Sequence, residues 1–132
     1  MILEFIDSGL PAGSQWVNRK YRLTRATDVK KVRRFGKSFA HPLVVLVMMP
    51  GSPEKTLIGV IAGRSVGNAV LRNRAKRLLR ESIRPLLKDI PPGYHLVFIA
   101  RQGAPRADFH EIQSAVQNVL ERAKLLKVVH ES

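Results

Sequence analysis

Basic side chains gather in two windows of this 132-residue chain, and their type and spacing indicate phosphate binding. Residues 19–37 and 64–84 hold 16 of the 23 Lys and Arg residues but only two acids, Asp28 and Glu81. Each guanidinium offers a planar fork of N–H donors that matches two phosphate oxygens. Since 45% of the residues are hydrophobic, the chain can form a folded core. The formal net charge of +13 means that the positive charges on the surface of this fold repel one another. We therefore expect a polyanionic partner, with nucleic acid first and an anionic membrane surface second.

The second window has the pattern of an amphipathic helix with one cationic face. At about 100° per residue and with Arg72 at 0°, this face covers 0° to about 140° and contains Arg72, Lys76, Arg80, Asn73, Arg84 and Arg77. Apolar residues occupy the arc from about 240° to 20°, and Arg74 lies on its far flank. Like charges four residues apart cost about 0.2–0.5 kcal/mol per pair, which phosphates between them would offset. A helix lying on a membrane is disfavoured, because the apolar face has no aromatic anchor.

The sequence offers little for catalysis by the protein itself. It has no cysteine, which excludes disulfide frameworks, zinc fingers and thiol catalysis and fits a cytoplasmic location. The four histidines are far apart, the acids are few and scattered, and residues 59–68 contain neither a GxGxxG nor a Walker motif. We therefore expect no catalytic residue and no metal site in this chain. No apolar run approaches the roughly 18 residues of a membrane span.

Apolar periodicity predicts helices packed on a small sheet, in the order α-β-β-(β)-α-β-α, where the bracketed strand is optional. Helices are expected at residues 27–35, 68–84 and 108–123, with Asn68 capping the second and Asp108 forming a capping box with Glu111 on the third. Strands are expected at residues 43–49, 56–62 and 95–100, and a further short one near residues 38–41. The strands at 43–49 and 56–62 are separated by a turn, so a hairpin is expected there.

The length predicts a single domain, which we place at residues 19–127. Residues 1–18 show little periodicity and are expected to form an N-terminal extension, docked through apolar side chains such as Leu3 and Trp16. No secretory signal is expected in the extension, since residues 1–10 carry Glu4 and Asp7 and lack a basic segment. Residues 128–132 are expected to form a C-terminal tail.

The basic helix carries a specific resemblance. Residues 66–81, VGNAVLRNRAKRLLRE, resemble the arginine-rich signature helix of the protein component of bacterial ribonuclease P. Residues 21–23, residues 28–32 with Gly36, residues 91–94 and residues 99–101 are similar to other stretches of that family. The resemblance covers roughly residues 19–126, and residues 1–18 have no counterpart in it.

This resemblance implies a fold and a function. The fold implied is an α+β, or α/β, two-layer sandwich with a small, mostly antiparallel sheet and a left-handed βαβ crossover carrying the basic helix. The function implied is that of the protein subunit of a tRNA-processing endoribonuclease. Such a subunit binds the ribonuclease P RNA and the 5′ leader of precursor tRNA, while the RNA hydrolyses the phosphodiester with Mg²⁺ that the RNA holds. The protein alone would bind no cofactor, although small anions such as sulfate or phosphate are expected to bind it.

The resemblance also implies site residues. Contacts to the catalytic RNA are expected from Arg64, Asn68, Arg72, Asn73, Arg74, Lys76, Arg77 and Arg80. A cleft for the leader of precursor tRNA is expected to include Arg22, Val29, Arg33, Phe35, Phe39 and Val47. The chain departs from the family here, because Val29, Arg33 and Val47 stand where family members often have aromatic residues. Stacking on nucleobases, at about 1–3 kcal/mol per base, is expected to be weaker for that reason.

Two alternatives remain at this point. A non-catalytic RNA-binding protein of the ribosomal or RNA-chaperone type fits the composition equally well, and only the signature helix separates it from a ribonuclease P subunit. A metabolic enzyme with a related βαβ arrangement is disfavoured, because the chain lacks a phosphate-loop motif and an evident general base.

Overall fold

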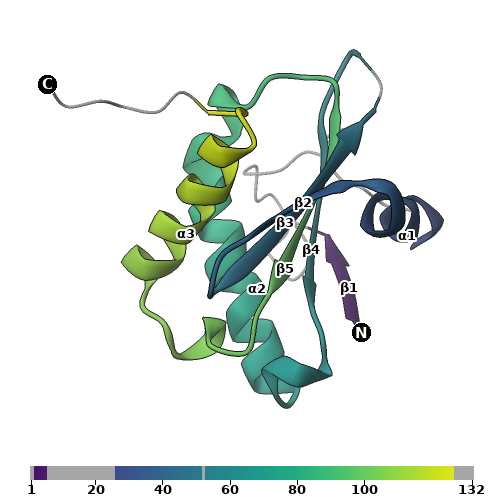
Figure 1. Cartoon of the computed structure of the whole chain (residues 1–132). Helices are drawn as coiled ribbons and strands as arrows, with labels where there is room; N and C mark the ends of the chain where they lie inside the picture. The colour runs from purple at the N-terminus through teal and green to yellow at the C-terminus, as the bar shows by residue number, and fades with distance from the viewer. Residues whose placement is uncertain (1, 6–25, 52, 127–132) are drawn as a thin grey trace, which may run out of the picture.

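The computed structural model describes residues 2–5, 26–51 and 53–126, which form a five-stranded sheet and three α-helices (Figure 1). The helices are α1 (Ala26–Phe35), α2 (Ala69–Ile83) and α3 (Phe109–Arg122). The strands are β1 (Ile2–Phe5), β2 (Lys37–Ala40), β3 (Val44–Pro50), β4 (Leu57–Ala62) and β5 (Tyr94–Ala100). Short 3₁₀ segments lie at Arg64–Val66, Arg84–Asp89 and Ala104–Arg106. The predicted helices and strands from residue 26 onward are therefore confirmed, including the short strand β2.

The sheet is mixed and mostly antiparallel, as expected, with the strand order β1-β4-β5-β3-β2. Only β4 and β5 run parallel, and α2 connects them, so the βαβ unit is present. The left hand of this crossover remains an implication of the family resemblance. Figure 1 shows α2 and α3 on one face of the sheet, which forms the expected sandwich, and α1 on the opposite face.

The expected hairpin between β3 and β4 is wrong, because β5 lies between these two strands. All seven residues of β5 pair antiparallel with β3, and six of them pair in parallel with β4 on the other side. Leu96, Val97 and Phe98 in the middle of β5 are each fully buried, so this strand needs a neighbour along both edges and a cover on both faces. The connection between β3 and β4 therefore crosses about 10 Å, the width of two strand spacings.

The strand β1 is an addition to the predicted fold. It pairs antiparallel with β4, with Ile2 opposite Ala62 and Phe5 opposite Gly59. Such a pairing uses main-chain hydrogen bonds to the outer edge of β4, and it therefore needs no periodic pattern of side chains. The sequence of residues 1–18 lacks that pattern, which is why no strand was expected there.

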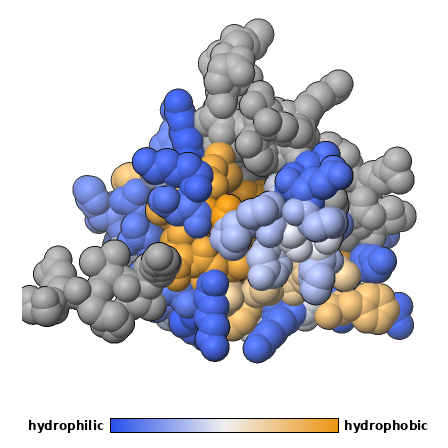
Figure 2. Space-filling model, turned by 90° about the horizontal axis from the view of Figure 1, so that it is seen from above, coloured by the Kyte–Doolittle hydropathy of each residue, from blue (hydrophilic) through white to orange (hydrophobic). Residues whose placement is uncertain are grey.

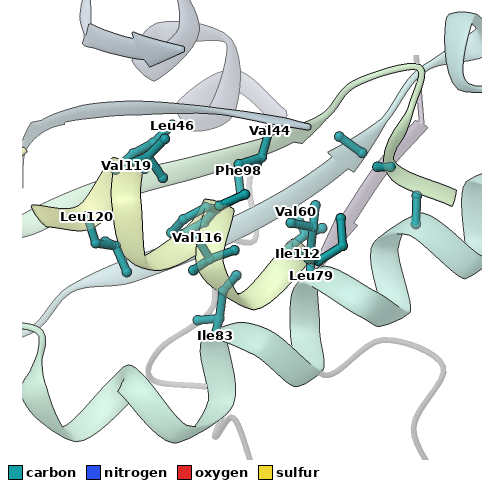
Figure 3. Close-up of a cluster of buried hydrophobic side chains, with 14 of the residues drawn as sticks. Val44, Leu46, Val60, Leu79, Ile83, Phe98, Ile112, Val116, Val119 and Leu120 are labelled. Carbon is teal, nitrogen blue, oxygen red and sulfur yellow. The ribbon is translucent and has the colours of Figure 1, made fainter. Parts of the chain in front are cut away.

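The larger core lies between the sheet and the pair α2 and α3. Figure 3 shows Leu79 and Ile83 of α2 near Ile112 and Val116 of α3, with Phe98 of β5 among them. All five of these side chains are fully buried. The spacing of buried residues in α3 follows the helical period, and both hydrogen bonds of the predicted capping box at Asp108 and Glu111 are present. This core fixes α2 on the sheet, and α2 is the element that carries the signature sequence.

A second, smaller core lies under α1. Val32 of α1 is fully buried against Val47, Ile61 and Val97, which lie on β3, β4 and β5. Gly36 ends α1, and its N–H donates to the Val32 carbonyl oxygen at 2.7 Å. A Cβ atom at Gly36 would collide with that oxygen and would lie 2.8 Å from the Met48 carbonyl oxygen. Only glycine allows α1 to turn into β2 so close to the sheet.

Gly36→Ala is therefore expected to lower the free energy of unfolding by about 1–3 kcal/mol, the range for overpacking against atoms that cannot move aside. Urea denaturation measures this change. Gly63→Ala is the matched control, because no atom lies within 4 Å of a Cβ placed at Gly63. Equal stability of the two variants would contradict the close approach of α1 to the sheet.

None of the helices in the described part of the chain is long and apolar enough to cross a membrane.

Candidate nucleic-acid interface

The first turn of α2 is fixed by local interactions. Asn68 Oδ1 accepts a hydrogen bond from the Leu71 N–H at 3.0 Å, which confirms the predicted cap. Gly67 has a φ of 138°, which residues with a side chain rarely adopt, and a Cβ there would lie 2.5 Å from Leu71 Cδ1. The segment before α2 thus enters the helix in one direction, and the side chains of the first turns have defined positions.

Most of the side chains assigned to RNA binding reach the surface. Arg72 is half-buried, and the exposed members of the set are Arg64, Asn68, Asn73, Arg74 and Arg77. Glu81 is the one acid within α2, and its Oε1 lies 3.5 Å from Arg77 Nε, with 73% of the Arg77 side chain exposed. An exposed pair of this kind contributes at most about 1 kcal/mol, so it does not neutralise the surface. The exposed part of α2 remains strongly cationic.

Lys76 and Arg80 do not belong to this exposed surface, which corrects the prediction of one continuous cationic face. Lys76 is 2% exposed and Arg80 is 8% exposed, and both take part in interactions within the chain. The buried residues of α2 run from Ser82 at about 280° through Leu79 at about 340° to Arg80 at about 80°. The two cations therefore lie on the flank of the covered half of the helix. Such small exposed fractions leave little of either charged end in water, so the interactions that both residues make within the chain must offset the cost of burying their charge.

The Nε donors of Arg74 and Arg72, both on α2, differ in whether they have a hydrogen-bond partner. Arg74 Nε donates a hydrogen bond of 2.7 Å to the carbonyl oxygen of Pro105, in the 3₁₀ segment before α3. This bond ties the basic helix to the start of α3 and fixes the direction of the Arg74 side chain. The Nε of Arg72 is buried and has no hydrogen-bond partner among the described residues. A buried donor without an acceptor costs about 1–3 kcal/mol, so Arg72 has an unmet need for an acceptor.

The exposed face of α2 includes two residues that the predicted site lacked. Val70 is 74% exposed, and Arg84, at the C-terminal end of the helix, is also exposed. The helical projection already places Val70 at about 160°, directly opposite Leu79 at about 340°. The exposure of Val70 can therefore be predicted from the sequence, although an apolar residue in a helix is easily assigned to the core.

The structure separates the residues predicted for the leader cleft. Arg22 and the side chain of Val29 lie outside the described part of the chain. Arg33 and Phe35 are exposed on α1, and Phe35 is 68% exposed with the Arg34 guanidinium 5.4 Å from the centre of its ring. An exposed aromatic ring is a suitable platform for a nucleobase, and the guanidinium beside it adds positive charge for the backbone of the same strand.

Val47 and Phe39 do not fit a shared cleft, and their assignment to it is corrected. Val47 is 3% exposed beneath Val32, so it has almost no surface to offer. Phe39 pairs with Leu46 across β2 and β3, and it packs against the core on the side of α3, not on the side of α1. Alternate residues of a strand point to opposite faces of a sheet, which is why proximity in the sequence misplaced Phe39.

Two further features of the described surface are its distribution of metal-ligating side chains and one cavity. The described residues contain no group of three or more His, Asp or Glu side chains close enough to hold a metal ion. Figure 2 looks down on the molecule and shows an apolar area among hydrophilic side chains. A cavity of about 510 Å³ is lined by residues including Lys55, Ile58 and Leu87. It lies at the start of β4, whereas Arg64 follows the end of that strand, so the cavity is separate from the N-terminal end of α2.

Comparison with known proteins gives consistent matches. A family model described as Ribonuclease P matches residues 17–124. Proteins named Ribonuclease P protein component in Herpetosiphon aurantiacus and Symbiobacterium thermophilum are 38% and 40% identical to the chain over 109 and 112 residues. These alignments cover 83% and 84% of the chain and 89% and 97% of the two relatives.

Solved structures agree with the sequence matches. The RNase P protein from Staphylococcus aureus superposes with a TM-score of 0.71 at 29% identity, covering 81% of this chain and 98% of that one. The RNase P protein from Thermotoga maritima superposes with a TM-score of 0.68 at 28% identity, covering 76% of this chain and 96% of that one.

Proposed function

The chain belongs to the ribonuclease P protein family, and from this membership we propose how it acts within a ribonucleoprotein. As a ribonuclease P protein subunit, it has an RNA-binding role in tRNA processing. Its partners are the ribonuclease P RNA and precursor tRNA. It promotes the Mg²⁺-dependent endonucleolytic removal of the 5′ leader, and the RNA carries out the hydrolysis. We place this assembly in the cytoplasm.

The observation that carries the proposal is the exposed face of α2. Asn73, Arg74 and Arg77 are exposed there beside Arg64, and a single acid accompanies them. Arginine forks fit phosphate oxygens in pairs, and an asparagine can reach a ribose hydroxyl or a base edge. Arg72, half-buried on the same helix, adds a further guanidinium to this set. The face is therefore suited to an RNA backbone.

The division of labour between protein and RNA follows from the charges. Mg²⁺ prefers oxygen ligands, chiefly carboxylates, phosphates and water. The chain has 10 acids against 23 Lys and Arg residues, so it is better suited to neutralising phosphates than to holding Mg²⁺. In the proposed particle, RNA phosphates hold the ions, and the protein allows RNA strands to approach one another. The same excess of positive charge is the basis for expecting sulfate or phosphate to bind the isolated protein.

For the leader of precursor tRNA, we propose Arg33 and Phe35 on α1 as the contact residues among those described. Both are exposed, and the Arg34 guanidinium over the Phe35 ring adds a cation for a neighbouring phosphate. One exposed aromatic ring provides one stacking platform, worth about 1–3 kcal/mol. The proposed leader contact is therefore modest compared with the contact between α2 and the catalytic RNA.

Reconstitution tests the proposed function. The purified chain is expected to cleave no precursor tRNA alone, whereas the chain added to its cognate ribonuclease P RNA should lower the Mg²⁺ concentration needed for 5′ cleavage. Cleavage of labelled precursor tRNA over a Mg²⁺ titration measures both effects. A ribosomal RNA fragment of equal length is the control for non-specific binding. Equal affinity for that fragment, with no effect on the Mg²⁺ requirement, would favour a general RNA-binding protein instead.

A further inference from the structure

One exposed apolar side chain lies within the cationic face of α2. Among the described residues, Val70 and Phe35 are the two large hydrophobic side chains that are strongly exposed, at 74% and 68%. Phe35 lies on α1, on the other side of the sheet. Val70 is thus the one such side chain in α2, and nothing in the described fold covers it. β-Branched residues also have a lower helix propensity than alanine, so Val70 does not serve the stability of α2.

The position of Val70 is fixed by its neighbours in the chain. Asn68 caps the helix at the Leu71 N–H, and the close approach of Leu71 to Gly67 holds the first turn. Val70 lies about 180° around the helix from Leu79, which is fully buried in the core under α2. The Val70 side chain therefore points directly away from the sheet, and it can bind a partner without a change in the fold.

The neighbours of Val70 on the helix surface define the chemistry of such a partner. Asn73 and Arg74 follow at three and four residues and Arg77 at seven, so all three lie on the same side of α2 as Val70. All of them are exposed, and they offer N–H donors and positive charge around one apolar group. The partner must therefore carry dense negative charge and an apolar face within a few ångströms of it. A nucleotide meets both conditions, since its ribose and base have apolar faces and its phosphate is anionic.

We propose that Val70 packs against a ribose or base face of the ribonuclease P RNA, as an apolar contact that positions α2 on the RNA. The proposal rests on the proposed function, because the RNA partner comes from there. It adds a contact that differs in kind from those of the arginines. Arginine contacts release counterions and weaken as salt rises, whereas an apolar contact does not involve ions. Salt therefore separates the contribution of Val70 from that of its neighbours.

Val70→Thr is the variant that tests this, because threonine has the same shape and β-branching but a hydroxyl in place of a methyl group. The dissociation constant of the ribonuclease P RNA is measured from about 50 to about 400 mM potassium chloride. Val70→Thr is expected to weaken binding about fivefold at every salt concentration, with the slope of log affinity against log salt unchanged. Arg77→Gln, measured in parallel, is expected to lower the slope by about 0.7–0.9.

Two outcomes for Val70→Thr would overturn the proposal. One is an affinity equal to that of the wild type at all salt concentrations. The other is a loss of affinity that shrinks as the salt concentration rises, because that would indicate a lost ionic contact. A second variant, Val70→Ala, removes both γ-carbons and should weaken binding at least as much as Val70→Thr does, so wild-type affinity of this variant would also overturn the proposal. Its melting temperature, together with that of Val70→Thr, shows that both variants are folded. Failure of the wild-type protein to bind the RNA would instead refute the proposed function, so the two failures are distinguishable.

Discussion

Replacing Arg64 and Arg77 together by glutamine is expected to weaken binding of the ribonuclease P RNA about 30-fold at about 0.1 M salt. Both side chains are exposed, and each is expected to neutralise one RNA phosphate. The plot of log affinity against log salt has a negative slope. Each lost phosphate contact makes this slope shallower by about 0.7–0.9, and two contacts account for a change of about 1.5. Filter binding or fluorescence anisotropy across a salt series measures the slope directly.

The matched control is the pair Lys88→Gln and Lys124→Gln. These side chains are also exposed, and they lie on the 3₁₀ segment after α2 and beyond the end of α3. Both pairs of substitutions lower the formal charge of +13 by two, so a difference between them reports position and not net charge. An equal loss of affinity for the two pairs would contradict a binding surface on α2.

Phe98→Ala is expected to lower the free energy of unfolding by about 3–5 kcal/mol, a large part of the roughly 5–15 kcal/mol that stabilises a typical domain. Phe98 is fully buried in the central strand and lies among side chains of α2 and α3 (Figure 3). Its removal leaves a cavity that two helices and the sheet cannot close together. Urea denaturation measures the change as a lower midpoint at constant slope.

Phe98→Leu is the control, because leucine fills part of the same space and should cost much less. A loss below about 1 kcal/mol for Phe98→Ala would contradict the packing of α2 against β5.

Inorganic sulfate offers a second measurement on the same variants. If it binds the folded state through the basic surface, it should raise the melting temperature of the wild type and of Phe98→Ala alike.

Much of this fold could be predicted from local sequence signals. Asn68 and the pair Asp108 and Glu111 are capping residues, and they define the starts of α2 and α3 without help from the rest of the chain. The apolar run of β5 indicated a strand buried on both faces. That run could not show which strands lie beside it. The preference for a hairpin is a rule about neighbours in the sequence, whereas β5 is buried on both faces and pairs along both edges, with β3 and with β4.

The candidate site was predictable in its chemistry but less so in its geometry. The basic residues of α2 were evident from the sequence, yet the burial of Lys76 and Arg80 depends on which elements cover that flank. Phe39 was misplaced for a similar reason, since the face of a strand residue depends on register. Val70 shows the reverse case, because its exposure follows from the helical projection alone.

The place of β5 between β3 and β4 has a consequence for how the chain folds as it is made. β3 and β4 leave the ribosome before β5, which ends at Ala100, so both present unpaired inner edges until then. α2 is synthesised in this interval, and its apolar side has no complete sheet to cover. Because the late strand closes the sheet and completes the core under α2, synthesis through Ala100 is required before the RNA-binding helix is held in place. Stable binding of the RNA by α2 is therefore expected only after β5 has been made.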